Sequence, residues 1–181
     1  MTNTKTLSLT LIALMTAITC ILGPISIVIP ISPVPISFTN LAIYLTVMIL
    51  GQKKGTISCM LYLLIGFAGV PVFSSFTAGP AKLLGPTGGY LIGFIFMAMV
   101  SGYFIEKFIG KIYMYIIGMI IGTTICYAFG TTWLSIQSNL SFSTALITGV
   151  LPYLPGDATK ILIATFAGTE IRKRLVKANL I

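Results

Sequence analysis

The sequence predicts an all-α integral membrane protein with six transmembrane helices and both termini in the cytoplasm. Three observations predict this class: scarce charge, six long apolar segments, and the placement of basic residues between them. Hydrophobic residues make up 56% of the 181 positions and charged residues 8%, and the mean hydropathy is +1.04. Soluble proteins contain about 25% charged residues, so this composition excludes a water-soluble globule. No hydrophilic stretch is long enough for a second unit, and we expect residues 1–181 to form a single transmembrane domain.

The apolar segments are the expected spans, because a helix needs about 20 mostly apolar residues to cross a bilayer. The first is followed by further spans, which argues against a cleaved signal peptide. The second is short, and the last is interrupted by Pro155-Gly156, a pair that usually interrupts or begins a helix. In chain order the spans are residues 7–28, 36–50, 57–72, 90–105, 112–133 and 142–168.

Basic residues give these spans an orientation. With six spans, nine of the eleven Lys and Arg residues fall on one side, which the positive-inside rule identifies as the cytoplasm. Only Lys82 lies in a connection on the other side, and Lys160 lies within the last span. The net charge of +8 therefore reports topology, and we expect contact with membrane lipids but no nucleic-acid partner. The nine bases are Lys5, Lys53, Lys54, Lys107, Lys111, Arg172, Lys173, Arg174 and Lys177.

The outer connections are long and rich in Pro, Gly, Ser and Thr. Residues 73–89, between the third and fourth spans, include four glycines, two prolines and four hydroxyl residues. Loops of this length are usually functional or disordered, and their modest polarity here argues for order. We expect them to form ordered lids over a cavity that faces outward.

The composition also argues against several kinds of chemistry. The chain has no histidine, which is the commonest general base and metal ligand. Cys20, Cys59 and Cys126 lie in separate apolar runs without C-x-x-C spacing, so we interpret them as small core residues. With three acids and no visible nucleophile–base set, we expect no enzyme, no metal site and no cofactor.

Asp157 and Lys160 are the strongest candidates for a binding site, since residues three apart share a helix face. Arg172 marks the predicted cytoplasmic boundary of the membrane. At 1.5 Å per residue along a helix, Asp157 lies roughly 22 Å and Lys160 roughly 18 Å from that boundary. Both then lie in the outer half of a core about 30 Å thick. An ionisable side chain there costs at least about 2.5–3.5 kcal/mol and normally faces a partner or a wet cavity. The pair would suit a small solute with polar ends.

A purely structural interpretation of the pair stays open. Asp157 after Pro155-Gly156 would be a good helix N-cap, and Lys160 could extend to the interface or pair with Asp157. The position of the pair on the side of the long loops favours the binding interpretation.

Two weaker features accompany the pair. The run Gly85-Pro86-Thr87-Gly88-Gly89-Tyr90 could bring bare backbone close to a ligand or could be an ordinary turn. It is no P-loop, because no Lys-Ser or Lys-Thr follows it. Lys82, just upstream, could steer an anion or bind lipid phosphate.

Small residues four apart form flat stripes where another helix can come close. Ala13 and Ala17 have this spacing in the first span, and Gly118 and Gly122 have it in the fifth. We expect the glycine pair to serve packing inside the fold.

Taken together, these segments resemble the BioY family, the biotin-binding S components of energy-coupling-factor (ECF) transporters. The resemblance runs over nearly the whole chain, and its most specific part is the Asp-x-x-Lys sequence after Pro-Gly. The segments that carry it are residues 33–36, 62–64, 69–73, 85–90 and 149–160.

The resemblance implies a six-helix S-component fold in the bacterial cell membrane, with a biotin site near the outer face. It also implies an energising module of one transmembrane subunit and two ATPases, so that ATP is used by the partners only. Ala13 and Ala17 fall on the stripe that docks on the transmembrane partner. The chain departs from the family at residues 74–80, which are poorer in glycine, so Ser74, Ser75 or Thr77 could supply a side-chain ligand there. The expected biotin-binding residues are Asp157, Lys160, Gly85, Thr87, Gly88, Tyr90, Ser74, Lys82 and Tyr153.

Two other functions stay open on the sequence alone. The chain could be an S component for a different vitamin, which would keep the fold and the partners. It could also be a stand-alone secondary transporter, although such proteins often show internal repeats and this chain shows none.

Overall fold

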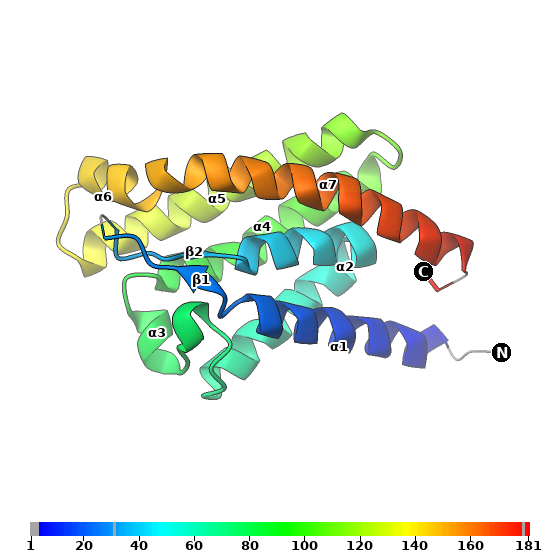
Figure 1. The fold of residues 1–181 in the computed structure, drawn as a ribbon, viewed down its shortest axis with the longest axis horizontal. Coiled ribbons are helices and arrows are strands. Elements are labelled where there is room, and N and C mark those ends of the chain that lie inside the picture. Colours follow the sequence, from blue (N-terminus) through cyan, green and yellow to red (C-terminus); the bar gives the residue numbers. More distant parts are fainter. Residues whose placement is uncertain (1–3, 31, 179) are drawn as a thin grey trace.

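The helical class is confirmed by the computed structural model, which describes residues 4–30, 32–178 and 180–181. Long helices lie side by side along one axis, and both described ends of the chain lie at the same end of the bundle (Figure 1). The elements in chain order are α1 (Thr4–Leu22), β1 (Ser26–Ile27), β2 (Ile36–Ser37), α2 (Thr39–Phe67), η1 (Ser74–Phe76), α3 (Pro80–Leu84), α4 (Gly88–Lys107), α5 (Ile112–Gln137), α6 (Phe142–Gly149), η2 (Leu151–Tyr153) and α7 (Leu154–Lys177).

Among the described residues, three helices are long and apolar enough to cross a membrane. They cover Lys5–Leu22, Gly88–Lys107 and Ile112–Gln137. The first span is therefore shorter than the predicted residues 7–28. Gly23 and Pro24 follow the helix, and a proline restricts the residue before it to extended backbone. The chain then enters strand β1, which was not predicted from the sequence.

The predicted second and third spans correspond to the two halves of α2, which is kinked at Gly51. The helix begins at Thr39 and ends at Phe67, so the predicted limits at residues 36 and 72 are too wide. Gly51 has φ +78° and ψ −171°, a conformation that favours glycine. Helices from elsewhere in the bundle supply partners on both sides of the break. The Gln52 amide donates to Oε1 of Glu106 at 2.9 Å, and Nη1 of Arg172 donates to the Met48 carbonyl at 3.0 Å. Arg172 thus has a structural role beyond marking one side of the membrane.

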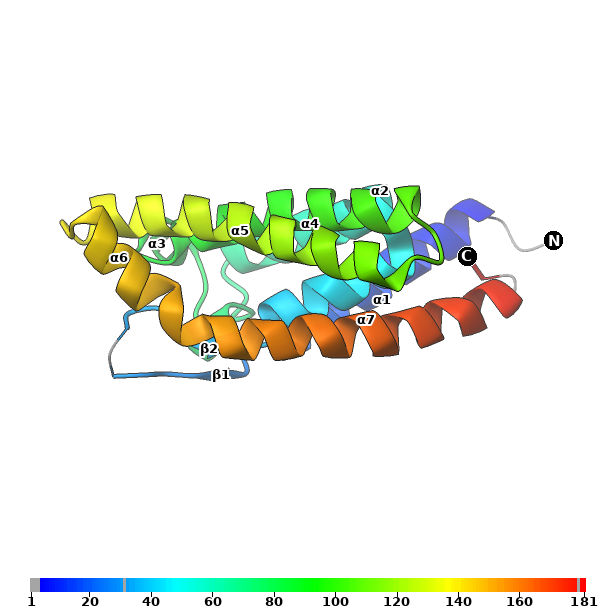
Figure 2. The same cartoon turned by 90° about the horizontal axis from the view of Figure 1, so that it is seen from above.

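Helices α4 and α5 pack closely along most of their length, as Figure 2 shows. A Cβ atom at Gly118 would lie 2.4 Å from Cβ of Phe104, and one at Gly122 would lie 2.6 Å from Oγ of Ser101. Only glycine allows this approach, so the expectation that these two glycines serve packing inside the fold is confirmed.

The predicted sixth span differs from the structure at both ends. Residues 142–168 divide into α6, the turn η2 and the start of α7, and Pro155 lies in the first turn of α7. Helix α7 then continues beyond Gly168 to Lys177. Gly168 lies in a close contact rather than at a helix end, because a Cβ there would be 2.7 Å from Cβ of Met48. The basic cluster therefore lies on the last turns of α7, where cations interact favourably with the helix dipole.

The long connections gather at the end of the bundle opposite the termini (Figure 1). There β1 and β2 pair antiparallel with Ser26 opposite Ser37, η1 contacts β1, and α3 and α6 lie at the same end of the bundle. Hydroxyl contacts tie two of these connections together. Ser26 and Ser75 lie 3.0 Å apart through their Oγ atoms, and the Ser75 amide donates to Oγ of Ser26 at 2.9 Å. These contacts hold the connections together at the end of the bundle opposite the termini, which we name the outer end after the orientation that the sequence predicts.

Candidate functional site

The two charged residues singled out in the sequence form a buried ion pair in the first turns of α7. Nζ of Lys160 lies 3.0 Å from Oδ1 of Asp157, and the two residues are 8% and 7% exposed. Asp157 is not the N-cap, since that position is Tyr153 and makes no side-chain capping bond. The structural alternative of an Asp cap is therefore wrong, whereas the pairing of Lys160 with Asp157 is confirmed.

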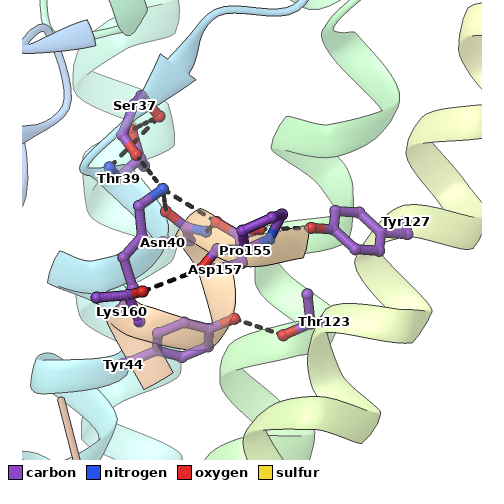
Figure 3. A network of polar contacts seen from close by, with 10 residues as sticks. Ser37, Thr39, Asn40, Tyr44, Thr123, Tyr127, Pro155, Asp157 and Lys160 are labelled. Atoms are coloured by element: carbon purple, nitrogen blue, oxygen red, sulfur yellow. Dashed lines mark hydrogen bonds and ion pairs between the residues drawn. The ribbon is translucent and has the colours of Figure 1, made fainter. Parts of the chain in front are cut away.

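Asn40, at the start of α2, completes the centre of this site (Figure 3). Its Nδ2 donates to Oδ1 of Asp157 at 2.6 Å, and its Oδ1 accepts from Nζ of Lys160 at 3.0 Å. The amide thus contacts both charges at once. Asn40 was not among the predicted site residues, although it is the only asparagine inside the predicted spans.

Two further groups satisfy the ends of the ion pair. The Tyr127 hydroxyl on α5 donates to Oδ2 of Asp157 at 2.6 Å, and the Ser37 carbonyl accepts from Nζ of Lys160 at 2.7 Å. Buried charges are tolerated only when paired and hydrogen-bonded, and here each charge has three polar contacts. Tyr127 was also missed, because nothing in its sequence spacing relates it to Asp157.

A second polar contact lies below this network. The hydroxyls of Tyr44 and Thr123 are 2.5 Å apart, and both residues are buried. Figure 3 shows them joining α2 to α5 beside Asp157. This contact helps to fix the spacing of the helices that carry Asn40 and Tyr127.

The ion pair faces a cavity at the outer end of the bundle, with a volume of about 70 Å³. Most of its lining is apolar or aromatic and comes from α2, α4, α5 and the segment before α2. Six of the nine predicted biotin-binding residues line it, and they come from three separate parts of the chain. They are Ser74, Thr87, Tyr90, Tyr153, Asp157 and Lys160.

Thr87 stands out in this lining. Its Oγ1 atom is buried and has no hydrogen-bond partner among the described residues. The Tyr90 hydroxyl, by contrast, donates to the Gly149 carbonyl at 2.9 Å. An unpaired buried hydroxyl costs free energy, so a ligand oxygen or N–H beside Thr87 would be stabilising.

The three other predicted residues do not line the cavity. The Gly85 carbonyl accepts from Nε1 of Trp133 at 2.9 Å. Gly88 permits a tight turn, because a Cβ there would lie 1.7 Å from the Leu83 carbonyl oxygen. Lys82 lies on α3, where partial burial lowers the pKa of its ammonium group.

The segment before α2 closes the cavity from outside. The Tyr153 hydroxyl donates to Oγ of Ser32 at 2.6 Å and also to the Val34 carbonyl. Val34 and Ser37 line the cavity themselves. These contacts join the start of α7 to the outer connection that covers the ion pair.

The predicted docking stripe lies away from this site. Ala13 and Ala17 are both exposed on α1. The opposite face of α1 is packed, and there Oγ1 of Thr16 lies 2.9 Å from Oγ of Ser58 on α2. The stripe is therefore free to meet another surface.

Comparison with known proteins matches nearly the whole chain to one family. The model of the BioY family matches residues 1–177. The chain is 36% identical to the "Biotin transporter BioY2" of Lactococcus lactis subsp. cremoris over 99% of this chain and 97% of that protein. It is 34% identical to the "Biotin transporter BioY" of Rhizobium etli, over 92% and 94% of the two chains.

A solved structure shares the fold. The crystal structure of the S-component for biotin from an ECF-type ABC transporter superposes with a TM-score of 0.89 at 34% identity. The match covers 96% of this chain and 94% of that one. The named relatives are transporters and transporter components, in agreement with the expectation that this chain is not an enzyme.

Proposed function

This chain belongs to the BioY family, and we infer from that membership that it is a biotin-binding S component of an ECF transporter. We propose that biotin binds in the outer cavity, against Asp157, Lys160 and Asn40. The observation that carries this proposal is the buried ion pair that a single amide bridges on the cavity wall.

The polar chemistry of the wall suits biotin. The ureido ring offers two N–H donors and one carbonyl acceptor, and the remainder of the molecule is apolar except for its carboxylate tail. The Asp157 carboxylate would accept from the ureido N–H groups, and Lys160 would donate to an acceptor oxygen. Thr87 supplies a hydroxyl that has no other described partner. The aromatic and aliphatic lining would then bury the apolar part of the ligand.

Binding requires the outer cover to move. Pockets that hold drug-sized ligands measure about 300–1,000 Å³, whereas this cavity measures about 70 Å³. The contacts of Tyr153 with Ser32 and Val34 are the ones that hold the segment before α2 over the ion pair. Opening them would enlarge the site toward the outside.

Transport needs energy from outside this chain, which contains no nucleotide motif. Under this proposal two ATPases and one transmembrane subunit supply it, and the exposed Ala13–Ala17 stripe docks on the transmembrane subunit. The chain resides in the bacterial plasma membrane with both termini in the cytoplasm, and the S component rotates in the membrane to release biotin inside. Both described ends of the chain lie at the end of the bundle opposite the long connections (Figure 1), and residues of those connections line the cavity. This arrangement supports the proposed orientation.

The direct test is to purify the chain and identify any co-purifying small molecule by mass spectrometry. Calorimetry with biotin and a panel of other vitamins should follow. Tight binding of biotin alone would support the proposal. Preference for another vitamin would leave an S component with a different ligand, and uptake by proteoliposomes without an ATPase would favour a stand-alone transporter.

A further inference from the structure

A second hollow, of about 300 Å³, lies between α5 and α7 on the side of the bundle. Exposed apolar residues from both helices form its rim: Ile120 is 50% exposed, Leu154 46% and Leu162 47%. Ala158 on α7 is exposed as well and lies in its lining. The hollow is thus an open groove rather than an enclosed cavity.

The groove opens toward hydrocarbon. Helix α5 is one of the described helices that are long and apolar enough to span a membrane. Beside the groove, Ile117 and Ile121 of α5 and Ile163 and Phe166 of α7 are also exposed. A surface with this composition at this position borders lipid chains rather than water.

The groove and the outer cavity share one wall of side chains. Thr123, Tyr127 and Asp157 line both hollows. A single layer of side chains therefore separates the outer cavity from the membrane. On that layer Tyr127 donates its hydroxyl to Oδ2 of Asp157.

The chemistry of the groove favours an apolar occupant. Tyr127 and Asp157 in the shared wall already pair with each other, and its exposed walls are formed by Ile120, Leu154 and Leu162. Lys160 does not line the groove, which leaves an anionic solute without a cation there. If the groove were empty, the apolar side chains of its walls would have no atoms to pack against on that side and would lose dispersion energy.

We propose that this groove binds one acyl chain of a membrane lipid. The chain packs between Ile120 on α5 and Ala158 and Leu162 on α7, and it forms the hydrocarbon side of the wall behind Asp157. This site does not depend on which ligand occupies the outer cavity.

Photo-crosslinking of the full chain in phospholipid nanodiscs tests the proposal. The probe is a phospholipid that carries a diazirine within its acyl chain. Peptide mapping should place most adducts within residues 116–127 and 154–162. Equal labelling of the exposed α4–α5 face around Phe96 and Phe129, which stack at 4.7 Å, would overturn the proposal.

Variants identify the groove itself. Ala158→Phe fills it from α7 and should lower groove adducts at least fivefold. Ile163→Phe is the matched control, because Ile163 is exposed on the same helix but outside the lining. Thr124→Phe fills the groove from α5 and provides an independent test if Ala158→Phe does not elute as a monodisperse protein. Unchanged labelling in a folded groove variant, or loss of labelling in excess biotin, would contradict an acyl-chain site.

Discussion

Nδ2 of Asn40 lies 2.6 Å from Oδ1 of Asp157, although 117 residues separate them in the chain. The same amide accepts from Lys160, so one neutral side chain orients both members of a buried ion pair. This relationship joins the start of α2 to the start of α7 and defines the polar centre of the outer cavity.

Replacing Asn40 should weaken biotin binding. Asn40→Ala removes the amide N–H that donates to Asp157 and the amide oxygen that accepts from Lys160. Each hydrogen bond to a charged group is worth about 1.5–3 kcal/mol. We expect at least a tenfold rise in Kd by calorimetry, since tenfold corresponds to about 1.4 kcal/mol. Gln137→Ala, which removes an exposed amide at the end of α5, is the control and should keep wild-type affinity. Equal affinities in the two variants would exclude Asn40 from the site.

Tyr127→Phe should reduce affinity by acting through Asp157. The change removes only the hydroxyl that donates to Oδ2 at 2.6 Å and preserves the ring. We expect a Kd several-fold to tenfold higher, measured by biotin titration. Tyr113→Phe removes an exposed hydroxyl from the same helix and should have no effect. An unchanged Kd for Tyr127→Phe would show that Oδ2 does not need this donor.

The ion pair should contribute to both binding and stability, and a double substitution separates the two. Lys160→Met leaves the Asp157 carboxylate buried without its cation, and breaking such a pair costs about 3–5 kcal/mol. Its Tm should fall, whereas Asp157→Asn combined with Lys160→Met should recover most of the Tm but not the affinity for biotin.

A matched exposed pair controls for charge removal. Glu170 and Arg174 lie 3.2 Å apart on the same helix with side chains 57% and 79% exposed. Glu170→Gln and Arg174→Ala should change Tm and affinity little, because exposed pairs contribute about 0–1 kcal/mol. Equal Tm values for Lys160→Met and the double variant would argue against a buried charge at Asp157.

Gly51→Ala should destabilise the protein more than an ordinary glycine substitution in a turn. A Cβ at Gly51 would lie 2.1 Å from Oε1 of Glu106, and the residue has φ +78°. Gly110→Ala is the control, since Gly110 has φ +85° with nothing within 4 Å of its Cβ. Both variants carry the backbone strain, so the difference in their Tm values measures the contact with Glu106. A difference near zero would show that Glu106 moves aside freely.

Enlarging the α1 stripe should block transport without affecting ligand binding. Ala17→Leu adds volume at an exposed position where close approach to a partner helix needs a small residue. We expect loss of ATP-dependent biotin uptake in the reconstituted transporter, with an unchanged Kd in the isolated chain. Ala128→Leu, an exposed alanine on α5, should retain uptake. Normal uptake by Ala17→Leu would place the docking surface elsewhere.

Much of the site was predictable because charge is rare in this chain. Asp157 and Lys160 are conspicuous in an apolar segment, and their spacing of three predicts the shared helix face that the structure shows. Asn40 and Tyr127 were not predictable in the same way. An amide or a phenol in a membrane helix has many possible partners, and the helix period says nothing about which neighbouring helix it meets.

The sequence by itself determined the membrane class, the six apolar segments, the side on which the bases lie and the pair at the start of α7. These follow from local physics, because transfer of charge into hydrocarbon is costly and helix spacing is regular. The tertiary structure alone decided that the second and third spans meet in a kink at Gly51, that Arg172 binds a carbonyl, and that Asn40 bridges the ion pair. Those features depend on contacts between helices distant in the chain, which packing fixes and periodicity does not encode.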